Sequence, residues 1–123
     1  MDFNNTQAIY LQIAAYVCDR IQLKVWKEDE KIPSVRELAV MLEVNPNTVM
    51  RSYEYLQHQE IIYTKRGMGY FAQAGASGNI LKTRREQFML EELPLIFKKM
   101  ELLNISAVEL QTRYQQFTGQ QNS

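Results

Sequence analysis

Three polar side chains that can hydrogen-bond to a nucleic acid, Asn47, Thr48 and Arg51, occupy one five-residue stretch of the sequence. Asn can make a two-point contact with adenine, Arg can make one with guanine, and Thr can reach a phosphate oxygen or a thymine methyl group. Because the major groove of DNA admits an α-helix, these contacts require the three side chains to project from an exposed helical face. The stretch predicts a DNA-reading surface if neighbouring elements supply such a face.

Charge alone does not separate this interpretation from a polar face that is simply solvated. Lys and Arg together number 14, as do Asp and Glu, and residues 1–76 carry 8 basic against 9 acidic side chains. Nucleic-acid binders often have a basic excess. Glu54, on the same side, would have to point past the phosphates or accept from a cytosine amine. The interpretation therefore depends on the elements that position the polar face.

The polar stretch lies on a predicted helix that begins at Asn45. Asn is a good N-cap, and Pro46 suits the first helical position, where its missing N–H costs nothing. At about 100° per residue, one stripe of this helix is apolar and buried. That stripe consists of Val49, Tyr53 and Leu56. The opposite face carries Asn47, Arg51 and His58, flanked by Thr48 and Met50.

Another helix is predicted just before it, from Ser34 to about Glu43. Pro33 stops any preceding helix, and Ser34 with Glu37 forms a Ser-x-x-Glu capping box. Its buried stripe consists of Val35, Leu38, Ala39 and Leu42. Because only two or three residues separate the two helices, they must cross at a steep angle. This is the helix-turn-helix arrangement.

An earlier helix, from Thr6 or Gln7 to Leu23, is predicted to complete the core. Its apolar residues recur at three- and four-residue steps: Ile9, Ile13, Tyr16, Val17 and Ile21. Cys18 lies beside this stripe and is interpreted as a small core residue, not as a reactive thiol. The polar stretch at residues 27–31 is predicted to be a loop.

A β-hairpin is predicted after the helix-turn-helix, from strand-forming residues at 61–64 and 70–72. The glycine-bearing turn between them contains Lys65, Arg66 and Gly67. A plain hairpin turn would also explain the glycines. Its position directly after a helix-turn-helix favours a wing, whose cations approach phosphates or the minor groove. Arg36 opposes the dipole of its helix, so either a phosphate or a surface ion pair with an acid such as Glu37 would offset the cost.

Small residues at positions 74–78 predict a flexible linker to a helical tail. Residues 80–103 have helical apolar spacing, and Pro94 should kink or split this helix. Asn104 is the predicted C-cap, and the capping box from Ser106 to Glu109 opens a last helix. These amphipathic helices must form either a lid on the core or, as we favour, a two-fold homodimer. The residues predicted to dimerise are Phe88, Leu93, Ile96, Phe97, Met100, Leu103, Leu110 and Tyr114.

Three blocks, in this order and spacing, resemble the DNA-binding domain of the GntR family: IPSVRELA (residues 32–39), VNPNTV (44–49) and RGMGYF (66–71). The resemblance covers about residues 7–73 and implies a winged helix-turn-helix. It also implies operator-DNA contacts by Arg36, Asn45, Asn47, Thr48, Arg51, Arg66 and Gly67.

The short tail is similar to that of the YtrA-like subfamily, which implies dimerisation through two C-terminal helices. The chain departs from the family pattern at Lys24, Asp29 and Glu60, where glycines are usual. We expect altered loop geometry at these positions, since a side chain disfavours the left-handed backbone conformation.

Composition excludes several other classes of protein. The chain is 46% hydrophobic and 23% charged, no run approaches the ~20 apolar residues of a membrane helix, and the N-terminus lacks a signal-peptide pattern. A single cysteine fits a reducing compartment, so a cytoplasmic location is expected. With one histidine and no nucleophile–base pair or phosphate loop, neither catalysis nor a metal or cofactor is predicted. A small-molecule effector stays unknown.

The predicted fold class is mostly α with a small β-hairpin. An N-terminal winged helix-turn-helix domain (residues 1–75) is followed by a linker and a two-helix C-terminal dimerisation tail (residues 76–123). The predicted function is a sequence-specific regulator of transcription that binds double-stranded DNA, a dimeric repressor on an inverted-repeat operator. The alternative is a winged-helix protein-interaction module, in which the outward helical face would tend to carry apolar anchors.

Overall fold

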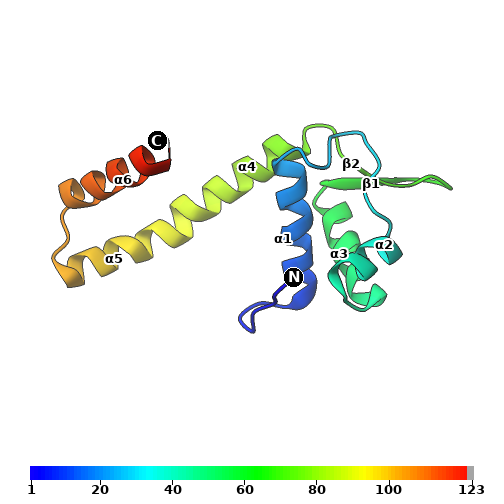
Figure 1. Ribbon diagram of the computed structural model, residues 1–123, viewed down its shortest axis with the longest axis horizontal. Coiled ribbons are helices and arrows are strands. Elements are labelled where there is room, and N and C mark those ends of the chain that lie inside the picture. The colour runs from blue at the N-terminus through cyan, green and yellow to red at the C-terminus, as the bar shows by residue number, and fades with distance from the viewer. Residues whose placement is uncertain (122–123) are drawn as a thin grey trace. The chain divides into compact units, whose positions relative to one another are not determined.

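The computed structural model describes residues 1–121 and divides them between two compact units, Met1–Thr83 and a second that begins at Arg84 (Figure 1). The elements in order are α1 (Ile9–Gln22), α2 (Val35–Leu42), α3 (Pro46–His58), β1 (Ile62–Lys65), β2 (Gly69–Ala72), α4 (Ala76–Gln87), the π-helical η1 (Phe88–Glu92), α5 (Leu93–Leu103) and α6 (Ala107–Gln121). The predicted fold class, mostly helical with one small hairpin, is confirmed.

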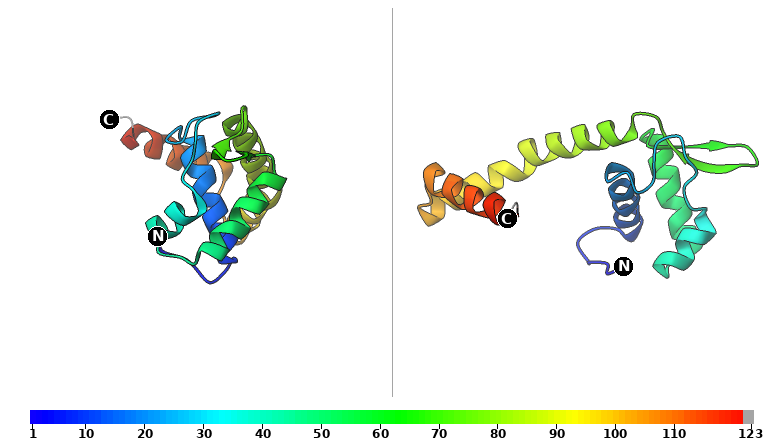
Figure 2. Two further views of the ribbon diagram at one scale, coloured as in Figure 1. Left: turned by 90° about the vertical axis from the view of Figure 1, so that its right-hand side faces the viewer. Right: turned by 45° about the horizontal axis from the view of Figure 1, so that its top comes forward.

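The core of the first unit lies where α1, α2 and α3 meet. The predicted stripe of α3, Val49, Tyr53 and Leu56, is fully buried. From α1, Ile13, Val17 and Ile21 join it, whereas Ile9 at the helix start is exposed. Cys18 is half-buried and packs against this core, as predicted. Figure 2 shows α3 running beside α1, with the hairpin extending away from the helices.

Local caps fix the corner between α2 and α3. The Ser34 hydroxyl accepts from the Glu37 N–H, and the Glu37 carboxylate accepts from the Ser34 N–H, so the predicted capping box forms. Glu43 ends α2 in the left-handed conformation, with φ of 55°. The Asn45 side chain then accepts from the N–H of Asn47 at 2.8 Å, which confirms the second predicted cap. These caps satisfy amides that would otherwise lack partners within so tight a turn.

The hairpin pairs β1 with β2 in antiparallel register, with Ile62 opposite Ala72 and Lys65 opposite Gly69. The predicted loop at residues 27–31 also contributes to this layer. The Asp29 N–H donates to the Ala72 carbonyl at 2.7 Å, and the Ile32 N–H donates to the Tyr70 carbonyl at 3.0 Å. One edge of β2 is therefore occupied by the segment that leads into α2, which ties the hairpin to the helix-turn-helix.

Three residues where glycines were expected adopt the left-handed conformation themselves. The φ angles of Lys24, Asp29 and Glu60 are 61°, 60° and 58°. This is the conformation that glycine adopts without strain, so the predicted alteration of loop geometry is wrong at these positions. The chain keeps the tight turns and tolerates a side chain in each of them.

The predicted linker is also wrong from Ala76 onward, because α4 begins there. Ala76 is 0% exposed and Ile80 is 3% exposed, so the first turns of α4 belong to the core of the first unit. The carboxylate of Glu28 accepts from both the N–H and the hydroxyl of Ser77, at 3.1 and 2.9 Å, and so caps the helix. The unit boundary accordingly lies between Thr83 and Arg84 and not near residue 75.

In the second unit, Pro94 was predicted to kink or split the helix. The π-helical η1 ends at Glu92, two residues before Pro94, and α5 follows at once from Leu93, so Pro94 does not split the helix. Pro94 has no N–H to donate to the carbonyl four residues earlier, and a widened turn accommodates that loss. Asn104 ends α5 as predicted, with φ of 55°. The Ser106 hydroxyl accepts from the Glu109 N–H at 3.1 Å, which is one of the two hydrogen bonds of the predicted capping box.

Candidate nucleic-acid interface

The start of α3 presents its polar residues on different sides of the helix. Asn47 is exposed, while the side-chain oxygen of Asn45 is already used in the cap. Thr48 is half-buried, and its carbonyl accepts from the hydroxyl of the buried Ser52, which also bonds to a carbonyl of α1. Thr48 therefore lies on the side of α3 that packs toward α1, and Asn47 is the freer of the two to meet a base.

Arg51 is exposed, but its guanidinium does not extend freely into solvent. The guanidinium carbon lies 3.9 Å from the centroid of the Tyr10 ring on α1. The Tyr10 ring also packs edge-on against the ring of Tyr55 on α3. The two ring centroids are 6.2 Å apart, and the ring planes make an angle of 78°. The structure thus brings an aromatic residue of α1 to the recognition helix, and sequence spacing gave no sign of this contact.

Arg36 lies in the first turn of α2 and is exposed. Its neighbour Glu37 was the candidate for a surface ion pair, but the Glu37 carboxylate accepts from the Ser34 N–H at 3.0 Å. This hydrogen bond lowers the pKa of Glu37 below its ordinary value, which keeps the carboxylate charged and occupied. The positive charge of Arg36 remains at the surface of the helix-turn-helix.

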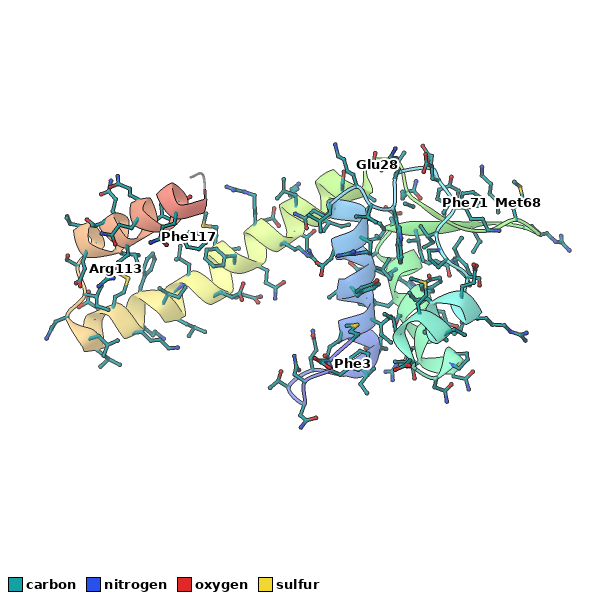
Figure 3. All side chains as sticks on the ribbon, in the orientation of Figure 1. Phe3, Glu28, Met68, Phe71, Arg113 and Phe117 are labelled. Carbon is teal, nitrogen blue, oxygen red and sulfur yellow. The ribbon has the colours of Figure 1, made fainter. Side chains whose placement is uncertain are left out.

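The turn of the hairpin is closed by a hydrogen bond from the Met68 N–H to the Lys65 carbonyl at 2.9 Å. Gly67 has a φ of 76° and open space where a side chain would lie, so backbone conformation and not crowding requires glycine here. Arg66 and Gly67 are exposed at the tip. Lys65 is exposed as well, but its ammonium lies over the hairpin, 4.7 Å from the Phe71 ring centroid. Figure 3 shows Met68 toward the outer end of the hairpin, with Phe71 nearer the helices.

Aromatic residues dock the hairpin on the recognition helix. The hydroxyl of Tyr53 donates to the Pro33 carbonyl at 2.6 Å, and its ring meets Tyr70 of β2 edge-on at 4.8 Å. Burial raises the pKa of Tyr53, so this phenol stays protonated and remains a donor. The Tyr70 hydroxyl in turn contacts the sulfur of Met50 at 3.8 Å. Met50 therefore lies on the hairpin side of α3, opposite the side that meets Tyr10.

Lys31 is a cation that sequence reasoning missed. Its side chain runs beside Gly69, where an added Cβ would come within 3.0 Å of the Lys31 Cε atom. Residue 31 also bridges to Phe71 in the antiparallel sense. Because the two segments are about 40 residues apart in the chain, no local pattern could have placed Lys31 on the hairpin. The wing thus carries Lys31, Lys65 and Arg66.

A metal site, a small-molecule site and a membrane span would each place different requirements on the described residues. Within residues 1–121 no group of three or more His, Cys, Asp or Glu side chains is arranged to hold a metal ion. A surface hollow of about 270 Å³ is lined by Glu54, Gln57 and His58, below the usual range for a small-molecule site. None of the helices in these residues has the length and apolar character required to span a membrane.

A steep two-helix corner with a polar second helix, followed by a cationic hairpin, defines the winged helix-turn-helix class of DNA-binding domain. Residues 9–71 match the family model described as bacterial regulatory proteins, gntR family. The chain therefore belongs to the GntR family of DNA-binding transcriptional regulators.

Individual relatives agree with this assignment over most of the chain. The HTH-type transcriptional regulator YhcF of Bacillus subtilis is 34% identical over 116 residues, which are 94% of each chain. The HTH-type transcriptional repressor YtrA of the same organism is 34% identical over 67% of this chain and 63% of its own. A solved GntR-family regulator from Bacteroides thetaiotaomicron is 51% identical, with a TM-score of 0.80 over 93% of this chain and 99% of that chain. The resemblance to GntR regulators, YtrA included, is confirmed.

Proposed function

We propose that the chain is a cytoplasmic, dimeric repressor that binds an inverted-repeat operator sequence-specifically. The observation that carries the proposal is the exposed start of α3, where Asn47 and Arg51 project from a helix fixed by caps at the α2–α3 corner. Such a helix can enter the major groove while its neighbour crosses the backbone. The relative YtrA is a transcriptional repressor, and this supports repression, as opposed to activation, as the proposed effect on transcription.

The predicted contact residues divide between two roles. Asn47 and Arg51 read bases: the Asn amide can both donate to and accept from adenine, and the Arg guanidinium can donate twice to guanine. The cations Arg36 and Arg66 contact phosphates and so set the register of the protein on the duplex. The remaining predicted contacts are Asn45, Thr48, Lys65 and Gly67. Of these, Thr48 is half-buried and Lys65 rests on Phe71, so their contributions should be smaller.

The tail supports the dimer. Of the residues predicted to dimerise, Leu93 and Met100 are half-buried and the other six are exposed: Phe88, Ile96, Phe97, Leu103, Leu110 and Tyr114. Further exposed apolar side chains of the same helices are Leu102, Val108 and Phe117. Apolar surface of this extent is typical of a protein–protein contact. A second copy of the chain would cover it and would pair two heads with two operator half-sites.

Selection of binding sites from random double-stranded DNA tests the whole proposal. We expect a palindrome whose half-sites lie about one helical turn, ~10 base pairs, apart or at a multiple of it. Arg51→Ala should cost about 1–3 kcal/mol and relax discrimination at one base position, while Arg66→Ala should weaken binding to all sequences alike. Recovery of no enriched sequence would contradict the proposal, as would wild-type affinity in both variants.

A second candidate, a winged-helix protein-interaction module, is favoured by two exposed apolar side chains of α2, Val40 and Met41. They lie on α2 and not on the outward face of α3, where such a module would tend to carry its anchors. The same selection distinguishes the candidates, because an interaction module would enrich no DNA sequence.

A further inference from the structure

We propose that Tyr10 of α1 is a positioning residue for DNA recognition, which holds the guanidinium of Arg51 in place for base contact. The inference rests on the proposed function, since it assigns a role within the same reading surface. Tyr10 lies outside the helix-turn-helix and outside the wing, so neither motif assigns it a part in recognition.

The contact has the geometry of a cation–π interaction. The Arg51 guanidinium carbon is 3.9 Å from the Tyr10 ring centroid, well inside the ~6 Å within which the ring quadrupole attracts a cation. At this distance the guanidinium carbon lies over the Tyr10 ring. The guanidinium has more N–H donors than a single ring can engage, so it can still make a two-point contact with guanine.

Tyr10 is itself fixed by α3. Its backbone carbonyl accepts from the hydroxyl of Ser52 at 2.7 Å, and Ser52 is fully buried and adjacent to Arg51 in the chain. Its ring packs edge-on against Tyr55, at 6.2 Å and 78°. The Tyr10 ring that lies against Arg51 is therefore anchored to α3 at two points, Ser52 directly after that arginine and Tyr55 one turn further along the helix.

Such anchoring matters because a free arginine samples many rotamers. Binding DNA would then require the side chain to lose that freedom, which weakens association. A guanidinium already stacked on a fixed ring loses less on binding. The ring also limits the directions from which the donors can approach a base, so discrimination at that base should depend on Tyr10 as well as on Arg51.

The test compares Tyr10→Leu with the matched control Tyr10→Phe in the full chain. Phe keeps the aromatic face, whereas Leu keeps apolar bulk without it. With the operator obtained by selection, Tyr10→Leu should weaken binding about 2- to 5-fold, the range that an exposed cation–π contact supplies. The loss should vanish on operators substituted at the base that Arg51 reads. Tyr10→Phe should match the wild type.

A double-mutant cycle separates positioning from a merely structural role. In an Arg51→Ala background, Tyr10→Leu should have no further effect on affinity. Equal losses in both backgrounds, or equal losses on all sequences, would overturn the inference. The inference would also be overturned if Tyr10→Leu bound the operator as tightly as the wild type or more tightly. The ring would then contribute nothing to binding, or it would hold Arg51 away from the base.

A Tyr10→Leu variant that fails to fold would also lose DNA binding, so the Tyr10–Arg51 contact should be measured without DNA as well. The ring current of Tyr10 should shift the side-chain proton resonances of Arg51 in the wild type and in Tyr10→Phe, and the shift should be lost in Tyr10→Leu. Unshifted resonances in the wild type would overturn the inference. Failure of the proposed function would look different: selection would enrich no site, and the Arg66→Ala variant would bind DNA as the wild type does.

Discussion

The two units of the chain use the same kinds of apolar residue with opposite results. In the first unit, Ile13, Leu38 and Tyr53 are completely buried among three helices and a hairpin. In the second, none of the residues of η1 and α5 is buried, and Leu102 is 84% exposed. Apolar periodicity predicted both sets of helices equally well, but it does not tell whether a helix finds its partner within the same chain.

This difference indicates where each unit obtains its stability. The first unit has its own core, so its unfolding should be independent of protein concentration. The helices of the second unit expose the faces that would normally drive folding, and short helices without such packing are marginal in water. Their order should therefore depend on a partner and so on concentration.

The largest effect is expected in the core of the first unit. Leu38→Ala should lower the free energy of unfolding by about 2–5 kcal/mol, because it removes buried methyl groups and leaves a cavity. Leu102→Ala in the second unit is the matched control and should change the free energy of unfolding of the first unit by less than about 0.5 kcal/mol. Chemical denaturation followed by circular dichroism measures both. Similar losses in the two variants would refute the contrast between the units.

The next effect tests the tail as a dimer contact. Phe97 is half exposed on α5. A dimer that buries this side chain would also bury the unpaired charge of Phe97→Glu, so this variant should be monomeric. Operator binding should then weaken about 100-fold or more, because two linked heads bind with avidity that single heads lack. Sedimentation velocity and titration of DNA measure the two consequences.

Its control is Lys98→Gln, which changes charge at the next, exposed position. This variant should remain dimeric and bind the operator as the wild type does. A dimeric Phe97→Glu variant with normal affinity would leave the tail without its proposed role. A wild-type protein that is already monomeric at micromolar concentration would do the same.

What the sequence predicted well was local. Ser34 and Glu37 form their capping box, Asn45 caps α3, and the glycine-bearing turn joins two strands. Each of these features is decided by residues within a few positions of one another. Because the GntR blocks consist of these local features, the fold followed from the sequence, whereas the DNA contacts assigned to its residues stay predictions.

What the sequence could not predict was non-local. The ring that lies against Arg51 comes from Tyr10, and Lys31 joins the wing through a contact with residue 69. Neither partner is near in sequence. The prediction of a linker at Ala76 was wrong for a related reason. Small residues are typical of linkers, but they also allow close packing, and only the burial of Ala76 shows that it packs in the core.

A smaller effect should appear on acidification. Hydrogen bonds from the Ser77 N–H and hydroxyl lower the pKa of Glu28 below its ordinary value of 4.5. The folded state thus favours the carboxylate, so the stabilisation is present above the ordinary pKa and is lost as the pH falls through the lowered one. The thermal midpoint of the first unit should fall as the pH drops below about 4.5. Glu37 has a pKa shifted in the same direction by its own cap and should add to the fall.

Glu28→Gln isolates the contribution of the cap on α4, because Gln keeps an acceptor for Ser77 but does not titrate. The variant should show a shallower fall of thermal midpoint with acid than the wild type. A parallel pH profile in wild type and variant would show that the Glu28–Ser77 contact does not stabilise the start of α4.

The smallest effect concerns the strained turn after α3. Glu60 has a φ of 58°, where a side chain clashes with the backbone, so Glu60→Gly should raise the free energy of unfolding by up to about 1 kcal/mol despite the greater freedom of glycine in the unfolded chain. The control is Glu60→Ala, which removes the negative charge from the C-terminal end of α3 but keeps the Cβ. If strain limits stability, only Gly should stabilise. An equal gain from Ala would instead assign the effect to repulsion between the carboxylate and the helix dipole. Thermal denaturation of the three proteins decides between backbone and charge.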